Sequence, residues 1–328
     1  MRARDSLAGV PAEPGAAKPD PVLVIDSVIR SFGGLKAVDV AHLEIQRRSI
    51  TGLIGPNGAG KTTLFNVLTG FDRPTTGRWT FNGTSLARLA PHQVARRGVV
   101  RTFQLTKALA RLTVLDNMRL GAPNQAGERF FGALLGTWGA QERAITSKAG
   151  ELLARFQLDT KADDLAGSLS GGQRKLLEMA RALMMDPTIV MLDEPMAGVN
   201  PALTENLLQH VRSLRDDGMT VVFVEHDMDV IRDISDWVVV MAQGSVIAEG
   251  RAEALSSNKA VVDAYLGSHH DRALEFDAEG NPVGETAVLV AEIEDELEAA
   301  IHRGEDLSAP TGTGSTRTGP KHARRDQR

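Results

Sequence analysis

The chain has 328 residues, of which 42% are hydrophobic and 24% charged, a composition typical of a globular protein with one large or two small domains. Its net charge of -5 does not suggest a nucleic-acid-binding protein, and the lack of cysteine excludes disulfides, thiolate catalysis and cysteine-based metal sites. No apolar run approaches the ~18–20 residues of a membrane helix, and the N-terminus lacks the apolar core of a signal peptide. The chain is therefore expected to be cytoplasmic and to reach a membrane only through a partner.

Three segments of different composition follow one another along the chain. Residues 1–21 are rich in Ala, Pro and Gly and lack periodicity, which predicts a disordered tail. Residues 22–267 are predicted to form one compact domain. Residues 268–328 are predicted to be a flexible acidic and low-complexity extension, in which Val288–Arg303 could form an acidic amphipathic helix.

The compact part is predicted to alternate between strands and helices. The predicted strands are Val22–Phe32, Val38–Ile45, Ile50–Ile54, Thr188–Leu192, Thr220–Val224 and a hairpin over Trp237–Glu249 that turns at Gly244. The predicted helices include Lys61–Leu68, Arg174–Met184 and one that begins near Pro201. Near-continuous apolar strands separated by helices predict a parallel sheet that is covered on both faces. The stretch 105–169 lacks strong strands and is predicted to be an inserted helical subdomain.

A glycine-rich loop between an apolar strand and a helix has the pattern of a phosphate-binding loop. Its candidate binding residues are Gly55, Pro56, Asn57, Gly58, Ala59, Gly60, Lys61, Thr62 and Thr63. Glycine lets the backbone curl so that its N–H groups point inward, and the following helix adds positive potential beneath the phosphates. Lys61 would reach the β- and γ-phosphates, Thr62 would ligate Mg²⁺, and Thr63 would meet a phosphate. A glycine-rich turn without a ligand is the alternative.

A second apolar strand ends in two acidic residues, Asp193 and Glu194. At this position Asp193 would lie beside the metal ion, and Glu194 would lie where an attacking water could sit. A buried strand that merely ends in surface acids is the alternative. The presence of the phosphate-binding loop favours the functional interpretation.

The segment Leu169–Gln173 predicts a second anion site. Ser170 is a good N-cap for the helix that follows, while Gly171 and Gly172 leave bare N–H groups at its positive end. One nucleotide needs only one phosphate-binding loop, so the second site is explained by a symmetric pair in which each such segment caps the ATP held by the other chain. An ordinary capped helix is the alternative.

The segment Leu169–Gln173 resembles the signature sequence of ABC ATPases. Within it, the resemblance gives Ser170, Gly171, Gly172 and Gln173 as nucleotide-binding residues. The resemblance implies an α/β P-loop NTPase core with an N-terminal antiparallel β subdomain and an inserted helical subdomain. It also implies ATP and Mg²⁺ as cofactors. By the same resemblance, Phe32 would stack on adenine, Gln104 would contact Mg²⁺ and water, and His226 would contact the γ-phosphate. A packed strand aromatic and a structural histidine are the alternatives for Phe32 and His226. Asn200 stands where many ABC ATPases have Asp, which weakens a charge-based role there.

Five further segments, less specific than the ATPase motifs, resemble the ATPase subunits of branched-chain amino-acid importers. They are Phe32–Val38, Arg101–Gln104, Leu112–Asn117, Ala197–Pro201 and Val261–Gly267. This resemblance implies ATP hydrolysis with Glu194, His226 and Gln104 as catalytic residues. It implies transmembrane permease subunits and a second ATPase subunit, identical or paralogous, as partners. A periplasmic or lipoprotein solute-binding protein would be an indirect partner, and nucleic acid would not be one.

The importer resemblance places the chain at the inner face of the cell membrane, held there by permease subunits.

Five apolar residues of the helical stretch would either pack internally or form a groove for a permease helix. They are Phe130, Phe131, Leu134, Leu135 and Trp138. An ABC ATPase of another system, such as an envelope-lipid exporter, is one alternative function. A non-transport ABC protein acting on ribosomes or DNA is another. Such proteins usually carry two ATPase units or a long coiled-coil insertion, and this sequence has neither.

Overall fold

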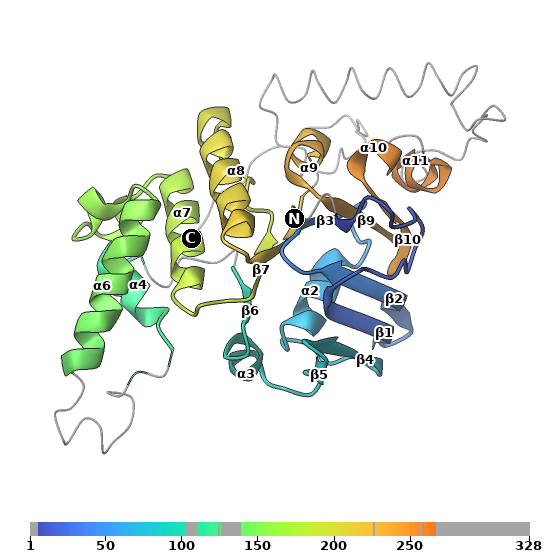
Figure 1. Ribbon diagram of the computed structural model, residues 1–328, viewed down its shortest axis with the longest axis horizontal. Coiled ribbons are helices and arrows are strands. Elements are labelled where there is room, and N and C mark those ends of the chain that lie inside the picture. The colour runs from blue at the N-terminus through green and yellow to red at the C-terminus, as the bar shows by residue number, and fades with distance from the viewer. Residues whose placement is uncertain are drawn as a thin grey trace, which may run out of the picture. The chain divides into compact units, whose positions relative to one another are not determined.

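The structure is a computed structural model that describes residues 6–102, 110–123, 125, 139–225, 227–255 and 258–266. The chain divides into two compact units, Met1–Arg272 and Ala273–Arg328. The elements described below belong to the first unit and are labelled in Figure 1. The extension predicted for residues 268–328 lies outside the described residues, as do the five apolar side chains between residues 130 and 138.

The first sheet is antiparallel and four-stranded, with the order β2-β1-β4-β5. Its strands are β1 (Pro21–Phe32), β2 (Leu35–Gln46), β4 (Thr76–Phe81) and β5 (Thr84–Ser85). Alternate side chains of the strands are buried, including Leu23 and Ile25 on β1 and Trp79 and Phe81 on β4, as expected for a sheet with one face on the core. The predicted antiparallel β subdomain is confirmed, although its later strands β4 and β5 were not predicted.

The second sheet is six-stranded, with the order β10-β9-β3-β8-β7-β6. Its strands are β3 (Ile50–Ile54), β6 (Val99–Arg101), β7 (Ile189–Asp193), β8 (Thr220–Val224), β9 (Trp237–Ala242) and β10 (Ser245–Gly250). All neighbours pair in parallel except β10, which forms an antiparallel hairpin with β9. The predicted parallel sheet is therefore confirmed, with the predicted hairpin at one edge and the unpredicted β6 at the other.

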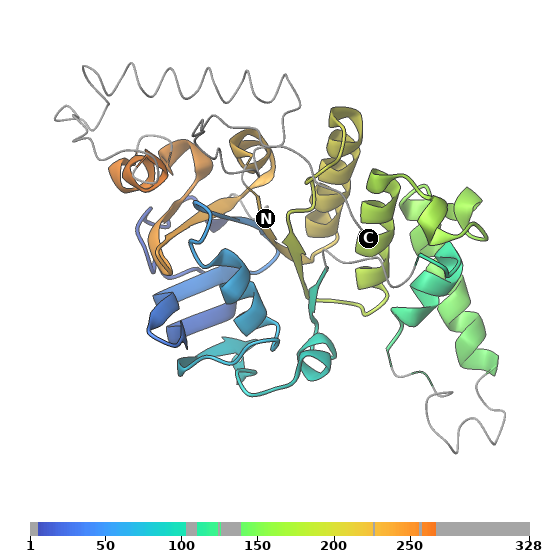
Figure 2. The same ribbon diagram turned by 180° about the vertical axis from the view of Figure 1, so that it is seen from behind.

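Both faces of the second sheet are covered, because side chains alternate between its two sides. One face carries Ile54, Leu192 and Phe223 and packs against helices. These helices are α7 (Gly171–Leu183), α8 (Pro201–Asp216), α9 (Met228–Ile234), α10 (Ala252–Leu255) and α11 (Lys259–Leu266). The other face carries Leu53 and Met191 and packs against α2 (Lys61–Leu68) and the first sheet. Figures 1 and 2 show this layering from opposite sides.

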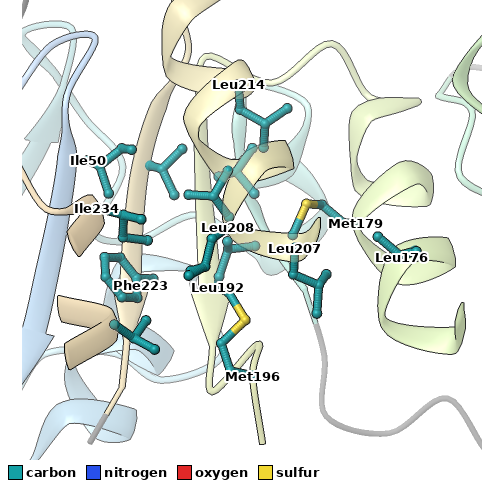
Figure 3. Packing of buried hydrophobic residues seen from close by; sticks show 14 of the residues in the cluster. Ile50, Leu176, Met179, Leu192, Met196, Leu207, Leu208, Leu214, Phe223 and Ile234 are labelled. Atoms are coloured by element: carbon teal, nitrogen blue, oxygen red, sulfur yellow. The ribbon is translucent and has the colours of Figure 1, made fainter. Parts of the chain in front are cut away.

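Helix α8 joins the second sheet to the helical part of the molecule. Figure 3 shows Leu207 of α8 between Leu192 of β7 and Met179 of α7, within one continuous cluster of buried side chains. The described residues of the stretch 105–169 contain α4 (Val114–Leu120), α6 (Gly139–Arg155) and two 3-10 turns, Asp159–Lys161 and Ala166–Ser168. The same cluster includes residues of α4 and α6. The helical character predicted for this stretch is thus present in its described residues.

Residues 6–20, here called the strap, pack against the domain, so the prediction of a disordered tail is wrong for them. Leu7 and Ala16 are buried, and a Cβ on Gly250 would contact Ala12. The strap is held by contacts between residues more than two hundred positions apart, which local composition does not encode.

A buried ion pair fixes the end of the strap. Lys18 Nζ lies 2.9 Å from Oε2 of Glu249 on β10, with side-chain exposures of 1% and 0%. The same ammonium lies 4.6 Å from the centre of the Trp237 ring, whose Nε1 donates to Glu249 Oε2 at 2.8 Å. The backbone N–H of Ala16 donates to the other carboxylate oxygen at 2.9 Å. The carboxylate of Glu249 is therefore stable in the interior only because these donors surround it.

Lys18→Met is expected to lower the free energy of unfolding by about 3–5 kcal/mol, because it leaves the buried Glu249 carboxylate without its counter-charge. Lys36→Met is the control, since Lys36 pairs with Asp39 at the surface with side-chain exposures of 61% and 39% and should contribute less than ~1 kcal/mol. Denaturant titration of both variants gives the comparison. Equal midpoints for the two variants would rule out a stabilising role for the buried pair.

Candidate functional site

Four parallel strands bring their carboxyl ends to one edge of the second sheet. The register pairs Leu53 of β3 with Val224 of β8, and Val224 with Asp193 of β7. Arg101 at the end of β6 pairs with Met191. The segments that follow these strands therefore begin side by side, at the edge where parallel α/β sheets bind their ligands.

The loop between β3 and α2 requires glycine at two close approaches. Gly55 and Gly60 have φ angles of 146° and 96°, and Gly58 has 78°. A Cβ on Gly55 would overlap the carbonyl oxygen of Met241, and a Cβ on Gly60 would overlap that of Ala37. The loop is thus wedged between β2 and β9, and only glycine allows its backbone to curl there. The three glycines have the positive φ angles that a tightly curled loop needs, and the phosphate-binding role of the loop stays a prediction.

Lys61 is the first residue of α2, and its side chain folds back over the loop. Its Nζ donates to the carbonyl oxygens of Gly55 at 2.5 Å and Pro56 at 3.0 Å. Burial lowers the pKa of Lys61, while the charges of Glu194 and Asp193 act in the opposite direction. The lysine and the two acids therefore lie within electrostatic reach of one another. Thr62 is exposed in the first turn of α2, and Thr63 is half-buried.

Asp193 and Glu194 occupy different environments at the end of β7. The Asp193 side chain is 8% exposed and forms an ion pair with Arg101. Glu194 is half-buried and has a φ of 46°, a left-handed conformation that costs a non-glycine residue about 1–3 kcal/mol. It is held there by its N–H, which donates to Val224 O at 3.0 Å, and by its carbonyl oxygen, which accepts from Lys175 Nζ at 3.2 Å. These two hydrogen bonds fix the Glu194 backbone at the point where the chain leaves β7.

Ser170 caps α7 as predicted. Its Oγ accepts from the N–H of Gln173 at 3.2 Å, while Gln173 Oε1 accepts from the N–H of Ser170 at 3.0 Å, which is a capping box. A Cβ on Gly172 would overlap the Leu203 side chain, so this glycine lets α7 pack closely on α8. Ser170 and Gly171 are exposed, and this end of α7 is open to solvent. Helix α7 and the phosphate-loop helix α2 pack on opposite faces of the second sheet.

Phe32 lies at the end of β1 with 47% of its surface exposed, so it is not a packed core aromatic. The guanidinium of Arg30 lies 4.2 Å from the centre of its ring and pairs with Asp72 at 2.8 Å. The strand that follows, β2, touches the phosphate loop through Ala37. An exposed, cation-flanked ring on this hairpin is available to stack on a base.

Gln104 and His226 lie outside the described residues, so their roles stay predictions. The segment leading to Gln104 leaves β6 at the site edge, where the N–H of Thr102 donates to Met191 O at 3.0 Å. After His226, Asp227 caps α9 by accepting from the N–H of Asp229 at 2.9 Å. Both segments therefore start at the edge that carries the phosphate loop and the acids.

Asn200 is the N-cap of α8, since its Oδ1 accepts from the N–H of Leu203 at 3.0 Å. A neutral amide serves this purpose as well as a carboxylate does. Arg101 and Lys175 were not predicted as site residues. Nothing in the sequence near them indicates their contacts, because Arg101 meets Asp193 across 92 positions of the chain.

Helix α11 carries Tyr265, a residue that lies near the phosphate loop. Tyr265 is half-buried against the helix-covered core, and burial raises the pKa of its hydroxyl to about 12. The backbone of Gly55 acts on this pKa in the opposite direction. Tyr265 thus lies beside the first residue of the loop.

Among the described residues, no helix is long and apolar enough to cross a bilayer.

The same residues contain no group of three or more His, Asp and Glu side chains that could hold a metal ion. A metal ion in this site would therefore need ligands beyond the carboxylates, such as the Thr62 hydroxyl and the phosphates of a nucleotide.

Comparison with known proteins gives two family matches. Residues 38–197 match the family described as ABC transporter. Residues 245–271 match the family described as branched-chain amino acid ATP-binding cassette transporter. The first match contains the phosphate loop, Asp193 and Glu194. The second covers β10 and the helices up to Tyr265 and beyond.

Relatives and solved structures agree with these matches. The high-affinity branched-chain amino acid transport ATP-binding protein LivG of Escherichia coli is 40% identical over 251 residues, 75% of this chain and 98% of its own length. BraF of Pseudomonas aeruginosa, of the same description, is 39% identical over 250 residues, with coverages of 75% and 98%. A nucleotide-free ATP-binding cassette from an ABC transporter has a TM-score of 0.67 at 35% identity, covering 75% of this chain and 98% of its own. A dimeric cassette in a post-hydrolysis state with ADP and Pi has a TM-score of 0.59 at 25% identity, with coverages of 70% and 98%.

Proposed function

The chain belongs to the ATP-binding subunits of ABC transporters, and we propose that it drives the import of branched-chain amino acids through transmembrane permease subunits. Members of this family bind and hydrolyse ATP. The observation that carries the ATPase part of the proposal is the sheet register, which places the phosphate loop after β3 and the acids Asp193 and Glu194 after β7 at the same edge of the second sheet. The match of residues 245–271 to the branched-chain amino acid family favours this solute class.

The phosphate loop would hold the β- and γ-phosphates with its inward N–H groups and with Lys61. The Lys61 ammonium, which contacts the carbonyl oxygens of Gly55 and Pro56, would exchange these acceptors for phosphate oxygens. Thr63 follows in the first turn of α2, where its hydroxyl and the helix N-terminus favour an anion. Phe32 would stack on the adenine from the β1–β2 hairpin.

The donor set fits Mg²⁺, because the Thr62 hydroxyl and the Asp193 carboxylate are oxygen ligands of the kind that this cation prefers. Gln104 would complete the protein ligands. When bound, Mg²⁺ offsets the negative charge of the β- and γ-phosphates. Asp193 is largely buried at the strand end, so the protein holds its carboxylate in place before the nucleotide arrives.

Glu194 would orient the attacking water or accept its proton, and His226 would contact the γ-phosphate. Positioning and charge stabilisation dominate phosphoryl transfer, so a carboxylate held in a strained, fixed backbone suits this role. The bond between the γ-phosphorus and the bridging oxygen breaks as the water oxygen attacks, and ADP and phosphate are released.

Two ATPase subunits, identical or paralogous, would share two ATP molecules. Ser170 and Gly171 are exposed at the start of α7, a helix that packs on the sheet face opposite α2, which favours the use of this helix end on a nucleotide held by another chain. The dimeric cassette among the similar structures supports this pairing. Closure on ATP and reopening after hydrolysis would drive the permease subunits. The chain would then sit at the inner face of the membrane, and a solute-binding protein outside would deliver the solute.

Reconstitution tests this function. The chain is purified together with the membrane proteins it binds, the complex is placed in proteoliposomes with ATP on the side of the chain, and the solute-binding protein is added on the opposite side. ATP-dependent movement of leucine, isoleucine or valine, absent with Glu194→Gln, is the expected result. ATP-dependent movement of lipid would favour the exporter alternative, and recovery with ribosomes or DNA instead of membrane proteins would favour the non-transport alternative.

A further inference from the structure

Arg101 lies on β6 and contacts two further elements of the candidate site, β7 and α2. Its side chain is 9% exposed at the end of β6, and its Nη2 pairs with Asp193 Oδ2 at the end of β7. Its Nη1 donates to Oδ1 of Asn66 on the phosphate-loop helix α2 at 2.5 Å. The guanidinium carbon lies 5.6 Å from the centre of the Phe65 ring on the same helix. One buried guanidinium thus links β6, β7 and α2.

The shape of the guanidinium matters for this link. Its N–H groups point in fixed directions within a plane, so a contact to Asn66 with one nitrogen sets where the other nitrogen can hold a carboxylate. A lysine would supply the charge as a single point and could not fix both partners. Asp193 itself is 8% exposed, so its charge needs a partner before any cation arrives.

We propose that Arg101 is a positioning residue of the ATP hydrolysis site, which anchors Asp193 to the phosphate-loop helix and keeps it from binding divalent cations without nucleotide. The inference rests on the proposed function, in which Asp193 meets Mg²⁺ brought with ATP. Arg101 acts on Asp193 in two ways. It fixes the place of the carboxylate relative to α2, and its positive charge disfavours a second cation there.

A matched pair elsewhere in the fold separates this role from a structural one. Arg215 Nη1 lies 3.2 Å from Oδ1 of Asp236, whose side chain is 1% exposed. Asp236 Oδ2 accepts from the N–H of Ile50 at 2.9 Å, at the start of β3 and therefore at the sheet edge opposite the site. Arg215→Met also leaves a buried carboxylate without its arginine, but far from the nucleotide.

The test compares Arg101→Met, Arg101→Lys and Arg215→Met in the full chain. The first readout is the change in Tm caused by Mg²⁺ alone, without nucleotide. The second is kcat and KM for ATP at saturating Mg²⁺. Arg101→Met should gain a Tm increase with Mg²⁺ alone that the parent lacks. Its kcat should fall about 10–100-fold with a smaller change in KM. Arg101→Lys should keep the Mg²⁺ response of the parent and lose part of kcat.

Arg215→Met should lower Tm and leave the Mg²⁺ response and kcat at the parental values. If Arg101→Met shows the same pattern as Arg215→Met, Arg101 is only a structural residue and the inference is overturned. Should Arg101→Met fail to fold, Asn66→Ala replaces it, since it removes one anchor and keeps the ion pair; a parental kcat in Asn66→Ala would equally overturn the inference. If the unmodified chain has no ATPase activity, the proposed function is contradicted. The Tm change with Mg²⁺ alone would still show whether Arg101 keeps divalent cations away from Asp193.

Discussion

Lys61→Ala is expected to weaken ATP binding by about 10- to 150-fold. The ammonium is the main counter-charge of the β- and γ-phosphates, and a hydrogen bond to a charged group contributes about 1.5–3 kcal/mol. The fold should survive, because burial already disfavours the charged form of Lys61. Equilibrium binding of a fluorescent ATP analogue, competed with ATP, measures the loss.

The control for Lys61→Ala is Lys161→Ala, which removes a lysine whose pair with Asp164 is 45% exposed on both sides. Parental ATP affinity is expected for this control, together with a Tm close to that of the parent in both variants. If Lys61→Ala binds ATP as tightly as the parent does, the loop between β3 and α2 is not the phosphate site.

Glu194→Gln is expected to retain ATP binding and to lose turnover by about 10²–10⁴-fold, the range that a positioned general base contributes. Glutamine has nearly the same shape and can still form hydrogen bonds, but it cannot accept the proton of the attacking water. Loss of the negative charge also reduces repulsion against the ATP phosphates. The variant should therefore accumulate as a closed pair with ATP, as seen by size-exclusion chromatography beside a phosphate-release assay.

Ser170→Arg should have the opposite effect on pairing. A bulky side chain at the exposed end of α7 would block the γ-phosphate of the other chain's ATP, while the phosphate loop stays free to bind nucleotide. Ser170→Ala is the control for the lost helix cap, which by itself costs about 1 kcal/mol.

Glu205→Gln, at the exposed surface of α8, is the charge-matched control for Glu194→Gln. Parental phosphate release by Glu194→Gln would contradict the mechanism.

Features carried by neighbouring residues were predictable from the sequence. The phosphate loop combines an apolar strand, glycines and a helix start within a few residues, and β3 and α2 have the predicted bounds. Ser170 was recognised as a cap because a cap depends on the first turn of its own helix. The two acids at the end of β7 directly follow a buried apolar run, so neighbouring residues alone indicate their position.

Features that depend on distant residues were not predictable. The strap lacks periodicity, and its anchor Lys18 meets Glu249 across 231 positions. Strand β6 has only three residues, too few for an alternating pattern to show. Arg101 appeared in the sequence only as part of a family-like segment, because its partner Asp193 comes near it through the pairing of β6 with β7.

A cross-link between two copies of the chain tests the central claim, an ATP site shared by two subunits, most directly. The chain contains no cysteine, so Asn57→Cys in one copy and Ser168→Cys in a differently tagged copy place a single thiol at the exposed phosphate loop and near the exposed start of α7. Both copies carry Glu194→Gln and are treated with a short bismaleimide. Cross-links joining the two tags are expected with ATP, and they should disappear without ATP or when Lys61→Ala is added. A yield that ATP does not change would contradict the shared site.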